Sequence, residues 1–212
     1  KPKKIIIVEK DKNLSIKLKE KSNNFKNLKV INADILNFIS GKIEDKKIVV
    51  YGNLPYNIST QILARLILLS KWPPWYSKLI LMFQKEVADR IIAKDNSKNF
   101  SRLTVLCNWR LQIKKHFDVS KNCFFPRPKI NSTIFFFNFK KKIKKLSNEN
   151  MFYEIIKKSF NQRRKTMKNC LKFENIDIEK ILIKNNIRPN LRPEELDYND
   201  FANLSNSISN LK

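Results

Sequence analysis

The sequence predicts an α/β fold with a parallel sheet, followed by a smaller, all-helical carboxyl-terminal region. Two observations support this prediction. In the first half, short runs of β-branched residues alternate with longer stretches of helical spacing, which is the order that builds a parallel sheet. After residue 148 the apolar residues follow helical spacing only. The basic run 140–145 between these regions is interpreted as a solvated linker, so the predicted domains are residues 1–142 and 143–212.

The first half alternates in a regular order. Each strand is predicted from a short apolar run, and each helix from apolar residues three or four positions apart. The predicted elements are strand 4–9, helix 11–21, strand 28–33, a short helix near 36–40, strand 47–52, helix 59–70, strand 78–83 and helix 84–94. An apolar segment from Leu103 then predicts late strands around 109–117 and 133–139. Apolar spacing at Phe152, Ile155 and Ile156 predicts the first helix of the second region.

Composition limits the functions that need to be considered. The 212 residues carry a formal net charge of +25, which attracts a polyanion and makes nucleic acid the expected partner. The single histidine and scattered carboxylates offer no catalytic triad, so a hydrolase is not expected. Cys107, Cys123 and Cys170 form no Cys-x-x-Cys, which predicts free thiols in a reducing cytoplasm and no metal site. The longest apolar stretch is interrupted by Arg65, so no membrane span is expected.

A polar, aromatic turn follows the predicted strand 47–52. Asn53, Leu54, Pro55 and Tyr56 lie at the carboxyl end of that strand, where open α/β sheets bind ligands. The Asn53 amide and nearby main-chain carbonyls can accept both hydrogens of an exocyclic base amine, and Tyr56 can stack on the ring. Such contacts would localise the lone pair of the amine for attack. An ordinary proline-containing turn is the alternative interpretation.

Two carboxylates end earlier strands of the predicted sheet. Glu9 closes the run 3–8, and Asp34 closes the run 28–33. In nucleotide-binding α/β sheets, an acid after the second strand binds the ribose hydroxyls, and an acid on the next loop can accept from an adenine amine. Either residue could instead cap a helix or remain a solvated charge.

The motifs together resemble the KsgA family of S-adenosylmethionine-dependent rRNA adenine dimethyltransferases. The resemblance covers nearly the whole chain, in order. It rests on the segments Val8–Asp11, Asn32–Leu36, Gly52–Thr60, Gln84–Arg90, Arg102–Val105, Phe124–Ser132, Phe160–Thr166 and Arg192–Leu196.

The resemblance implies a class I methyltransferase fold, Rossmann-like, and a role for each site residue. Glu9 would bind the ribose of the cofactor S-adenosylmethionine and Asp34 its adenine amine. Asn53 would touch both cofactor and substrate, and Tyr56 and Phe124 would sandwich the target adenine. Phe125, the next residue, is expected in the core. The implied reaction is dimethylation of two adjacent adenosines near the 3′ end of 16S rRNA, in the immature small ribosomal subunit.

One family feature is missing from the sequence. The family has a Gly-x-Gly loop after its first strand, but this chain contains only Gly41 and Gly52. We therefore expect a sheet without its first strand and Gly-rich loop, an amino-terminally truncated chain, and weak or no cofactor binding by these residues alone. A catalytically inactive rRNA-binding assembly factor is one alternative. The related methylase of 23S rRNA and a nonspecific basic DNA binder are two others.

A basic cluster after Phe160 is the predicted RNA contact. Arg163, Arg164, Lys165 and Lys168 follow in what is taken as a continuing helical pattern, where charges can line a face toward phosphates. The protein is expected to act as a cytoplasmic monomer on the assembling subunit.

Overall fold

The computed structural model describes residues 2–39 and 48–211. Its first four strands form two separate parallel pairs. Strands β1 (Ile5–Glu9) and β2 (Leu28–Asn32) form one two-stranded sheet, with α1 (Lys12–Ser22) between them in the chain. The main sheet has the order β3-β4-β6-β5. Its strands are β3 (Ile48–Asn53), β4 (Tyr76–Gln84), β5 (Leu111–Val119) and β6 (Ser132–Phe139), with β3 and β4 parallel and the β4–β6 and β5–β6 pairs antiparallel.

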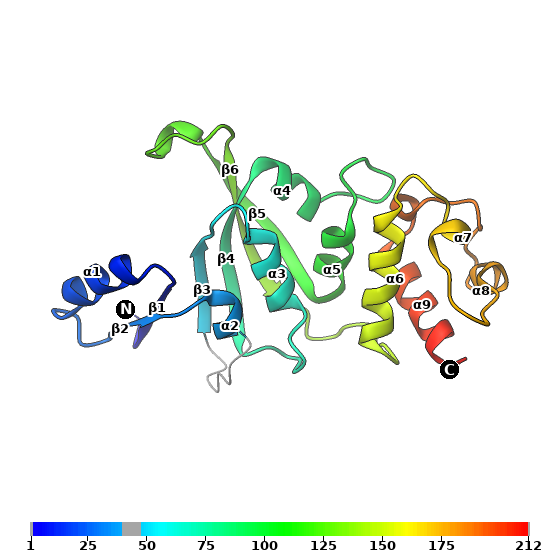
Figure 1. The fold of residues 1–212 in the computed structure, drawn as a ribbon, viewed down its shortest axis with the longest axis horizontal. Coiled ribbons are helices and arrows are strands. Elements are labelled where there is room, and N and C mark those ends of the chain that lie inside the picture. Colours follow the sequence, from blue (N-terminus) through cyan, green and yellow to red (C-terminus); the bar gives the residue numbers. More distant parts are fainter. Residues whose placement is uncertain (1, 40–47, 212) are drawn as a thin grey trace.

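Short helices connect and cover these strands. Figure 1 shows α3 and α5 in front of the main sheet and the β1–β2 unit to its left. The remaining elements of this half are α2 (Ile35–Ile39), α3 (Ser59–Ile67), α4 (Lys85–Ile91), α5 (Arg102–Arg110) and the 3-10 turn η1 (Lys121–Cys123). The predicted helix 36–40 and strand 47–52 each extend by one residue outside the described residues.

The two sheets do not join within the part of the chain that the structure describes. Neither β1 nor β3 has a strand partner on its second edge, and Figure 1 shows them apart. Side chains along these strands are exposed, with Ile6 at 42% and Tyr51 at 78%. This mixed α/β architecture agrees with the expectation of a class I methyltransferase fold.

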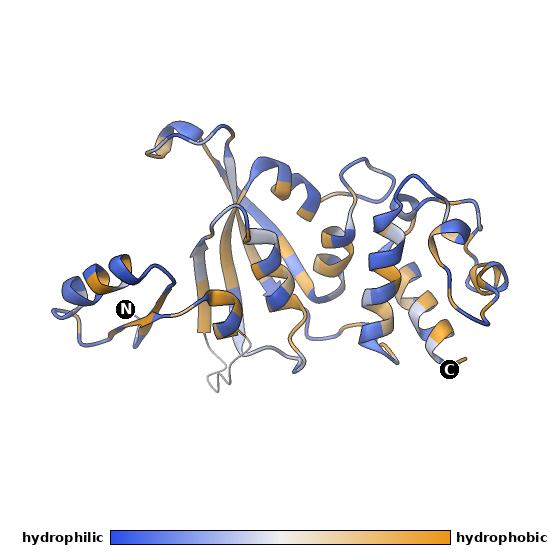
Figure 2. Cartoon of the chain, viewed as in Figure 1, coloured by the Kyte–Doolittle hydropathy of each residue, from blue (hydrophilic) through white to orange (hydrophobic). Residues whose placement is uncertain are grey.

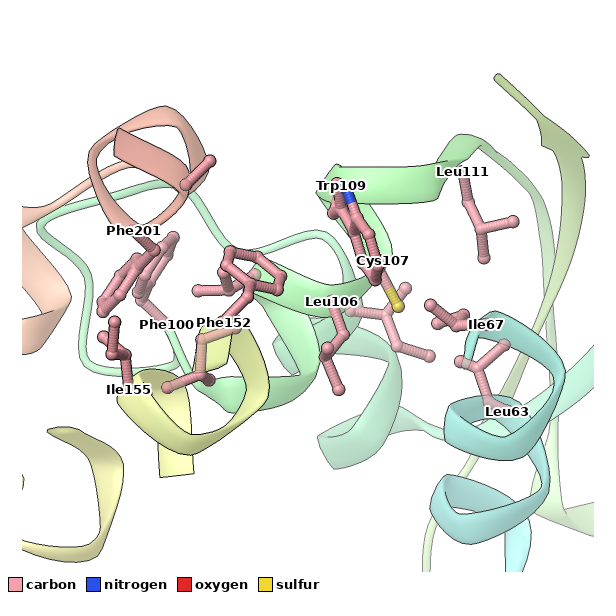
Figure 3. Packing of buried hydrophobic residues seen from close by; sticks show 14 of the residues in the cluster. Leu63, Ile67, Phe100, Leu106, Cys107, Trp109, Leu111, Phe152, Ile155 and Phe201 are labelled. Carbon is pink, nitrogen blue, oxygen red and sulfur yellow. The ribbon is translucent and has the colours of Figure 1, made fainter. Parts of the chain in front are cut away.

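The expected strand at 109–117 was partly wrong, because residues 102–110 form helix α5 and the strand begins only at Leu111. Six residues of this nine-residue helix are buried. Figure 3 shows why: Leu106 and Trp109 lie between Leu63 and Ile67 of α3 on one side and Phe152 on the other. A helix covered on nearly all sides has no polar face, so its sequence resembles a buried strand.

The carboxyl-terminal region is helical, as predicted. It contains α6 (Glu149–Asn161), α7 (Met167–Cys170), α8 (Ile178–Lys184), the 3-10 turn η2 (Pro193–Glu195) and α9 (Tyr198–Ser209). Its apolar face continues the core of the first half, since the rings of Trp109 and Phe152 lie 5.0 Å apart and those of Phe100 and Phe160 lie 6.1 Å apart. The regions on either side of the proposed boundary at 142/143 therefore share one core.

The basic run 140–145 is only partly the solvated linker expected. Lys140 is half-buried and lies over the Tyr198 ring, with Nζ 4.9 Å from its centroid. Its ammonium also donates to the carbonyl of Asn108. Burial lowers the pKa of Lys140. Lys140 therefore connects the sheet region to α9, while Lys141 and Lys142 remain exposed.

Hydropathy follows the layers of the fold. Figure 2 shows apolar residues on the strands of the main sheet and on the inner faces of α3, α5 and α6, with polar residues outside. Among the helices that the structure describes, none is long and apolar enough to cross a bilayer.

Candidate active site and RNA interface

The turn after β3 presents free hydrogen-bond acceptors. Asn53 is the last residue of the strand and pairs in register with Met82. Its side chain is exposed and makes no hydrogen bond to any described residue, and the Leu54 carbonyl accepts no hydrogen bond from the described residues. The Pro55 carbonyl, in contrast, already accepts from the Ile58 amide at 3.1 Å. The turn therefore offers Asn53 Oδ1 and Leu54 O to a donor.

Gly52 leaves space for two leucine side chains beside this turn. A Cβ at this position would lie 2.6 Å from Cδ2 of Leu54 and 3.0 Å from Cδ2 of Leu81. The first distance is shorter than real carbon contacts and the second is tight, so a side chain at this position would push the end of the Leu54 side chain aside. The glycine thus leaves room for the side chains of Leu54 and Leu81.

A residue at the start of a second strand, β6, holds the Tyr56 side chain in place. Its Oη lies 3.0 Å from Oγ of Ser132, the first residue of β6. Ser132 is fully buried, while Tyr56 is half-buried. Ser59 adds a second restraint, because its Oγ donates to the Tyr56 carbonyl at 3.2 Å. The sequence did not indicate Ser132 as a site residue, because strand register across the sheet decides this contact.

The loop between β5 and β6 carries Phe124 and leaves the sheet at the same end of the strands as the turn after β3. Asn131 holds the base of this loop: its Oδ1 accepts from the Lys121 amide at 3.0 Å and its carbonyl accepts from the Lys85 amide at 2.9 Å. Phe124 is half-buried and makes no ring contact with Tyr56. The core expectation for Phe125 was wrong, since its side chain is 101% exposed at the tip of the loop, where no element covers it.

Glu9 and Asp34 lie together at the ends of β1 and β2, but both take part in local contacts. Glu9 Oε1 accepts from the Asp11 amide at 2.8 Å. Asp34 Oδ1 accepts from the Leu36 amide at 2.9 Å, and its Oδ2 lies 2.8 Å from Lys10 Nζ. The hydrogen bond from Lys10 and then that from Leu36 lower the pKa of Asp34. Both acids are therefore held in place, and the second oxygen of Glu9 remains free.

The predicted site residues fall into two groups within the described structure. Glu9 and Asp34 belong to the β1–β2 sheet, and Asn53, Leu54, Pro55 and Tyr56 belong to the main sheet. No hydrogen bond or ion pair joins the groups. All of them lie at carboxyl ends of parallel strands, where α/β sheets bind nucleotides.

The predicted RNA cluster lies on a turn and not on the helical face expected. Helix α6 ends at Asn161, so Arg163, Arg164 and Lys165 occupy the turn before α7. Two of the four predicted cations have protein partners: Arg163 Nη2 donates to the Ser97 carbonyl at 3.2 Å, and Lys168 pairs with Glu179. Arg164 and Lys165 are exposed and form no ion pair with the described residues. Figure 1 shows this turn at the upper side, where β3 also passes into α3.

The α/β sheet, the polar turn after β3 and the acids after β1 and β2 define a class I methyltransferase. Two solved structures share the fold at low identity. A dimethyladenosine transferase from Plasmodium falciparum has a TM-score of 0.78 and 24% identity, over 98% of this chain and 82% of that one. The 23S rRNA methyltransferase ErmE has a TM-score of 0.64 and 19% identity, over 95% and 80%.

Sequence relationships identify the family. The chain belongs to the ribosomal RNA adenine dimethylase family, whose model matches residues 1–210. A relative named ribosomal RNA small subunit methyltransferase A, from Pelagibacter ubique, is 42% identical over 212 residues, which are all of this chain and 80% of the relative. A relative of the same name from Malacoplasma penetrans is 39% identical over 197 residues, 92% of this chain and 70% of the relative. The family expectation from the motifs is confirmed.

Proposed function

We propose that the protein dimethylates the exocyclic amine of two adjacent adenosines near the 3′ end of 16S rRNA during small-subunit assembly. The observation that carries this proposal is the pair of free acceptors, Asn53 Oδ1 and Leu54 O, on a turn beside Tyr56. Family membership supports the reaction class. The names of the two relatives above support the small subunit as the place of action.

The acceptors address the main chemical difficulty of the reaction. The lone pair of an adenine amine is delocalised into the ring, so the amine is a poor nucleophile. Asn53 Oδ1 and Leu54 O each accept one amine hydrogen, which favours a pyramidal nitrogen and aims its lone pair at the methyl donor. The amine loses its proton to solvent after attack, so no protein base is required. Pro55 has no amide hydrogen to compete for the acceptors.

Two aromatic residues would hold the extruded base. Tyr56 stacks on one face of the adenine, and a stacking contact contributes about 1 to 3 kcal/mol per base. Phe124 lies on the loop that leaves the same end of the sheet and takes the other face.

Glu9 and Asp34 fit the adenosine half of S-adenosylmethionine. The free carboxylate oxygen of Glu9 accepts from ribose hydroxyls, and Asp34, kept ionised by Lys10 and the Leu36 amide, accepts from the adenine amine. Asn53 lies between this half and the substrate. The bound cofactor supplies an electrophilic methyl group. No Gly-x-Gly is present among the 212 residues for its methionine half.

The exposed cations Arg164 and Lys165 would contact rRNA phosphates, with Arg163 and Lys168 behind them. We propose a monomer that works in the cytoplasm on immature small subunits.

Methyl transfer tests the function: the purified protein, S-adenosylmethionine with a labelled methyl group and immature small subunits should give labelled dimethyladenosine in 16S rRNA. Tight binding of the subunits without any transfer would contradict it and favour the inactive assembly factor.

A further inference from the structure

A basic pocket lies where the sheet region meets the helical region. Its volume is about 350 Å³. It opens beside the start of α5 and is lined in part by the segment that follows α4. The pocket is lined by Arg90, Lys98, Asn99, Phe100, Ser101, Arg102, Phe160, Asn161 and Arg163.

One wall is fixed by the start of α5. Thr104 Oγ1 donates to the Arg90 carbonyl at 2.6 Å, which ties the end of α4 to this helix. The Ser101 amide donates to Thr104 Oγ1 at 3.0 Å and places the residue before the helix. Arg102 is thus the first residue of the nine-residue helix α5, where the helix dipole adds positive partial charge.

The helical region supplies the other wall. Arg163 reaches the Ser97 carbonyl through Nη2, and its Nε lies 3.6 Å from Glu194 Oε2. The Asn96 amide donates to the Glu194 carbonyl at 2.6 Å. The pocket is therefore a feature of the docked regions and depends on both.

The pocket carries excess positive charge. None of its lining residues is acidic. Arg90 pairs with Glu86 at 2.5 Å and Arg163 with Glu194, so their charges are partly compensated. Lys98 and Arg102 are exposed and form no ion pair with the residues that the structure describes. Two uncompensated cations and the amides of Asn99 and Asn161 make a site for an anion with several acceptor oxygens.

We propose that this pocket binds a backbone phosphate of an RNA strand, so that the strand is held at the junction of the two regions. The inference rests on the proposed function and extends it to Lys98 and to Arg102, the first residue of the motif segment Arg102–Val105, to which the sequence assigned no role. Figure 1 shows the loop after α4, the turn after α6 and the passage from β3 into α3 on the same upper side of the molecule. An RNA strand that runs between the basic turn and the catalytic turn would pass this pocket.

The test compares two double variants with equal loss of charge. Lys98→Gln with Arg102→Gln removes the uncompensated cations of the pocket. Lys17→Gln with Lys19→Gln removes two exposed cations from α1, at the other end of the molecule. Affinity for a short, fluorescein-labelled single-stranded RNA is measured at several salt concentrations. All four side chains are exposed, so both variants should keep the melting temperature of the wild type.

The pocket variant should lose affinity several-fold and reduce the slope of log affinity against log salt by about 1, the change for one lost phosphate contact. The control variant should lose less affinity and keep the slope. If both variants behave alike while the wild type binds RNA in a salt-dependent way, the pocket proposal is overturned and the proposed function stands. A wild type without salt-dependent RNA affinity would overturn both.

Discussion

The hydroxyl groups of Tyr56 and Ser132 lie 3.0 Å apart and join the turn after β3 to the first residue of β6. The two residues are 76 positions apart in the chain. Their contact holds the ring that we propose to stack on the target base. It also connects this turn to the loop that carries Phe124, because that loop ends just before Ser132.

This contact should be measurable in a double-mutant cycle. Ser132→Ala and Tyr56→Phe should each lower the free energy of unfolding by about 1 kcal/mol, the net contribution of a typical hydrogen bond. The double variant should lose clearly less than the sum, because each single change removes the same interaction. Tyr51→Phe is the control, since Tyr51 is 78% exposed and should tolerate the change. Additive losses measured in urea would show that the hydroxyls do not interact.

Arg110 should contribute strongly to stability. The side chain is fully buried, and it lies over the rings of Trp109 and Trp72, with Cζ 3.9 and 4.6 Å from their centroids. It donates to the carbonyls of Ile67 and Leu69 and pairs with Glu149. Arg110→Met leaves both carbonyls without this donor. It should lower the free energy of unfolding, measured in urea, by about 2 to 4 kcal/mol.

The exposed Arg188 provides a matched control for that change. Arg188→Met should alter the free energy of unfolding by less than about 0.5 kcal/mol. A loss of similar size in both variants would contradict the structural role of Arg110. Glu149 is about half exposed, so Glu149→Gln should cost less than Arg110→Met.

The Asp118 carboxylate should make the β5–β6 pair sensitive to acid. Lys115 Nζ lies 2.7 Å from one oxygen and Thr133 Oγ1 donates to the other at 2.6 Å. The hydrogen bond from Lys115, and next that from Thr133, lower the pKa of Asp118. A lowered folded pKa means that the stabilisation is complete above the ordinary value of about 3.9 and is lost as pH falls below it. Asp118→Asn should therefore lower the melting temperature at pH 7, and the difference should disappear in strong acid. An equal difference at both pH values would contradict this assignment.

The two regions should unfold in one step, although the boundary at 142/143 stays a proposal. Phe152 is fully buried and its ring lies 5.0 Å from that of Trp109 in α5. Phe152→Ala should lower the free energy of unfolding by about 3 to 5 kcal/mol, the usual range when a buried phenylalanine is replaced by alanine. Tryptophan fluorescence reports the first region and far-UV circular dichroism the whole chain. Both should give one coincident transition in wild type and variant, whereas a separate early loss of helix would show an independently folding second domain.

The sequence could predict the strands, most helices and the turn after β3, because local periodicity and turn residues determine these features. It could not predict α5, since a helix buried on nearly all sides has no polar face. It also placed Arg163 to Lys165 on a helix that ends at Asn161. Ser132 and the pocket residues Lys98 and Arg102 were missed because long-range packing creates their roles. Arg102 and Ser132 belong to the motif segments Arg102–Val105 and Phe124–Ser132, but a motif alone does not show what a side chain contacts.

Variants of the proposed RNA contacts separate binding from chemistry. Arg164→Glu with Lys165→Glu should weaken binding to immature small subunits and raise KM for methylation, while kcat remains near the wild-type value. Neither side chain forms an ion pair with a described residue, so the fold should be preserved. A drop in kcat with unchanged binding would place these cations in the chemistry and contradict their proposed role.

The acceptor function of Asn53 is the central claim, and the most direct test measures N6,N6-dimethyladenosine in 16S rRNA by mass spectrometry. The gene for the protein is expressed in a host whose 16S rRNA lacks methyl groups on these adenosines. The wild type should restore the modified adenosines, and Asn53→Ala should abolish them while subunit binding stays within about twofold of the wild type, a difference of less than 0.5 kcal/mol. Full methylation by the Asn53→Ala variant would show that the amide oxygen is not what makes the adenine amine reactive.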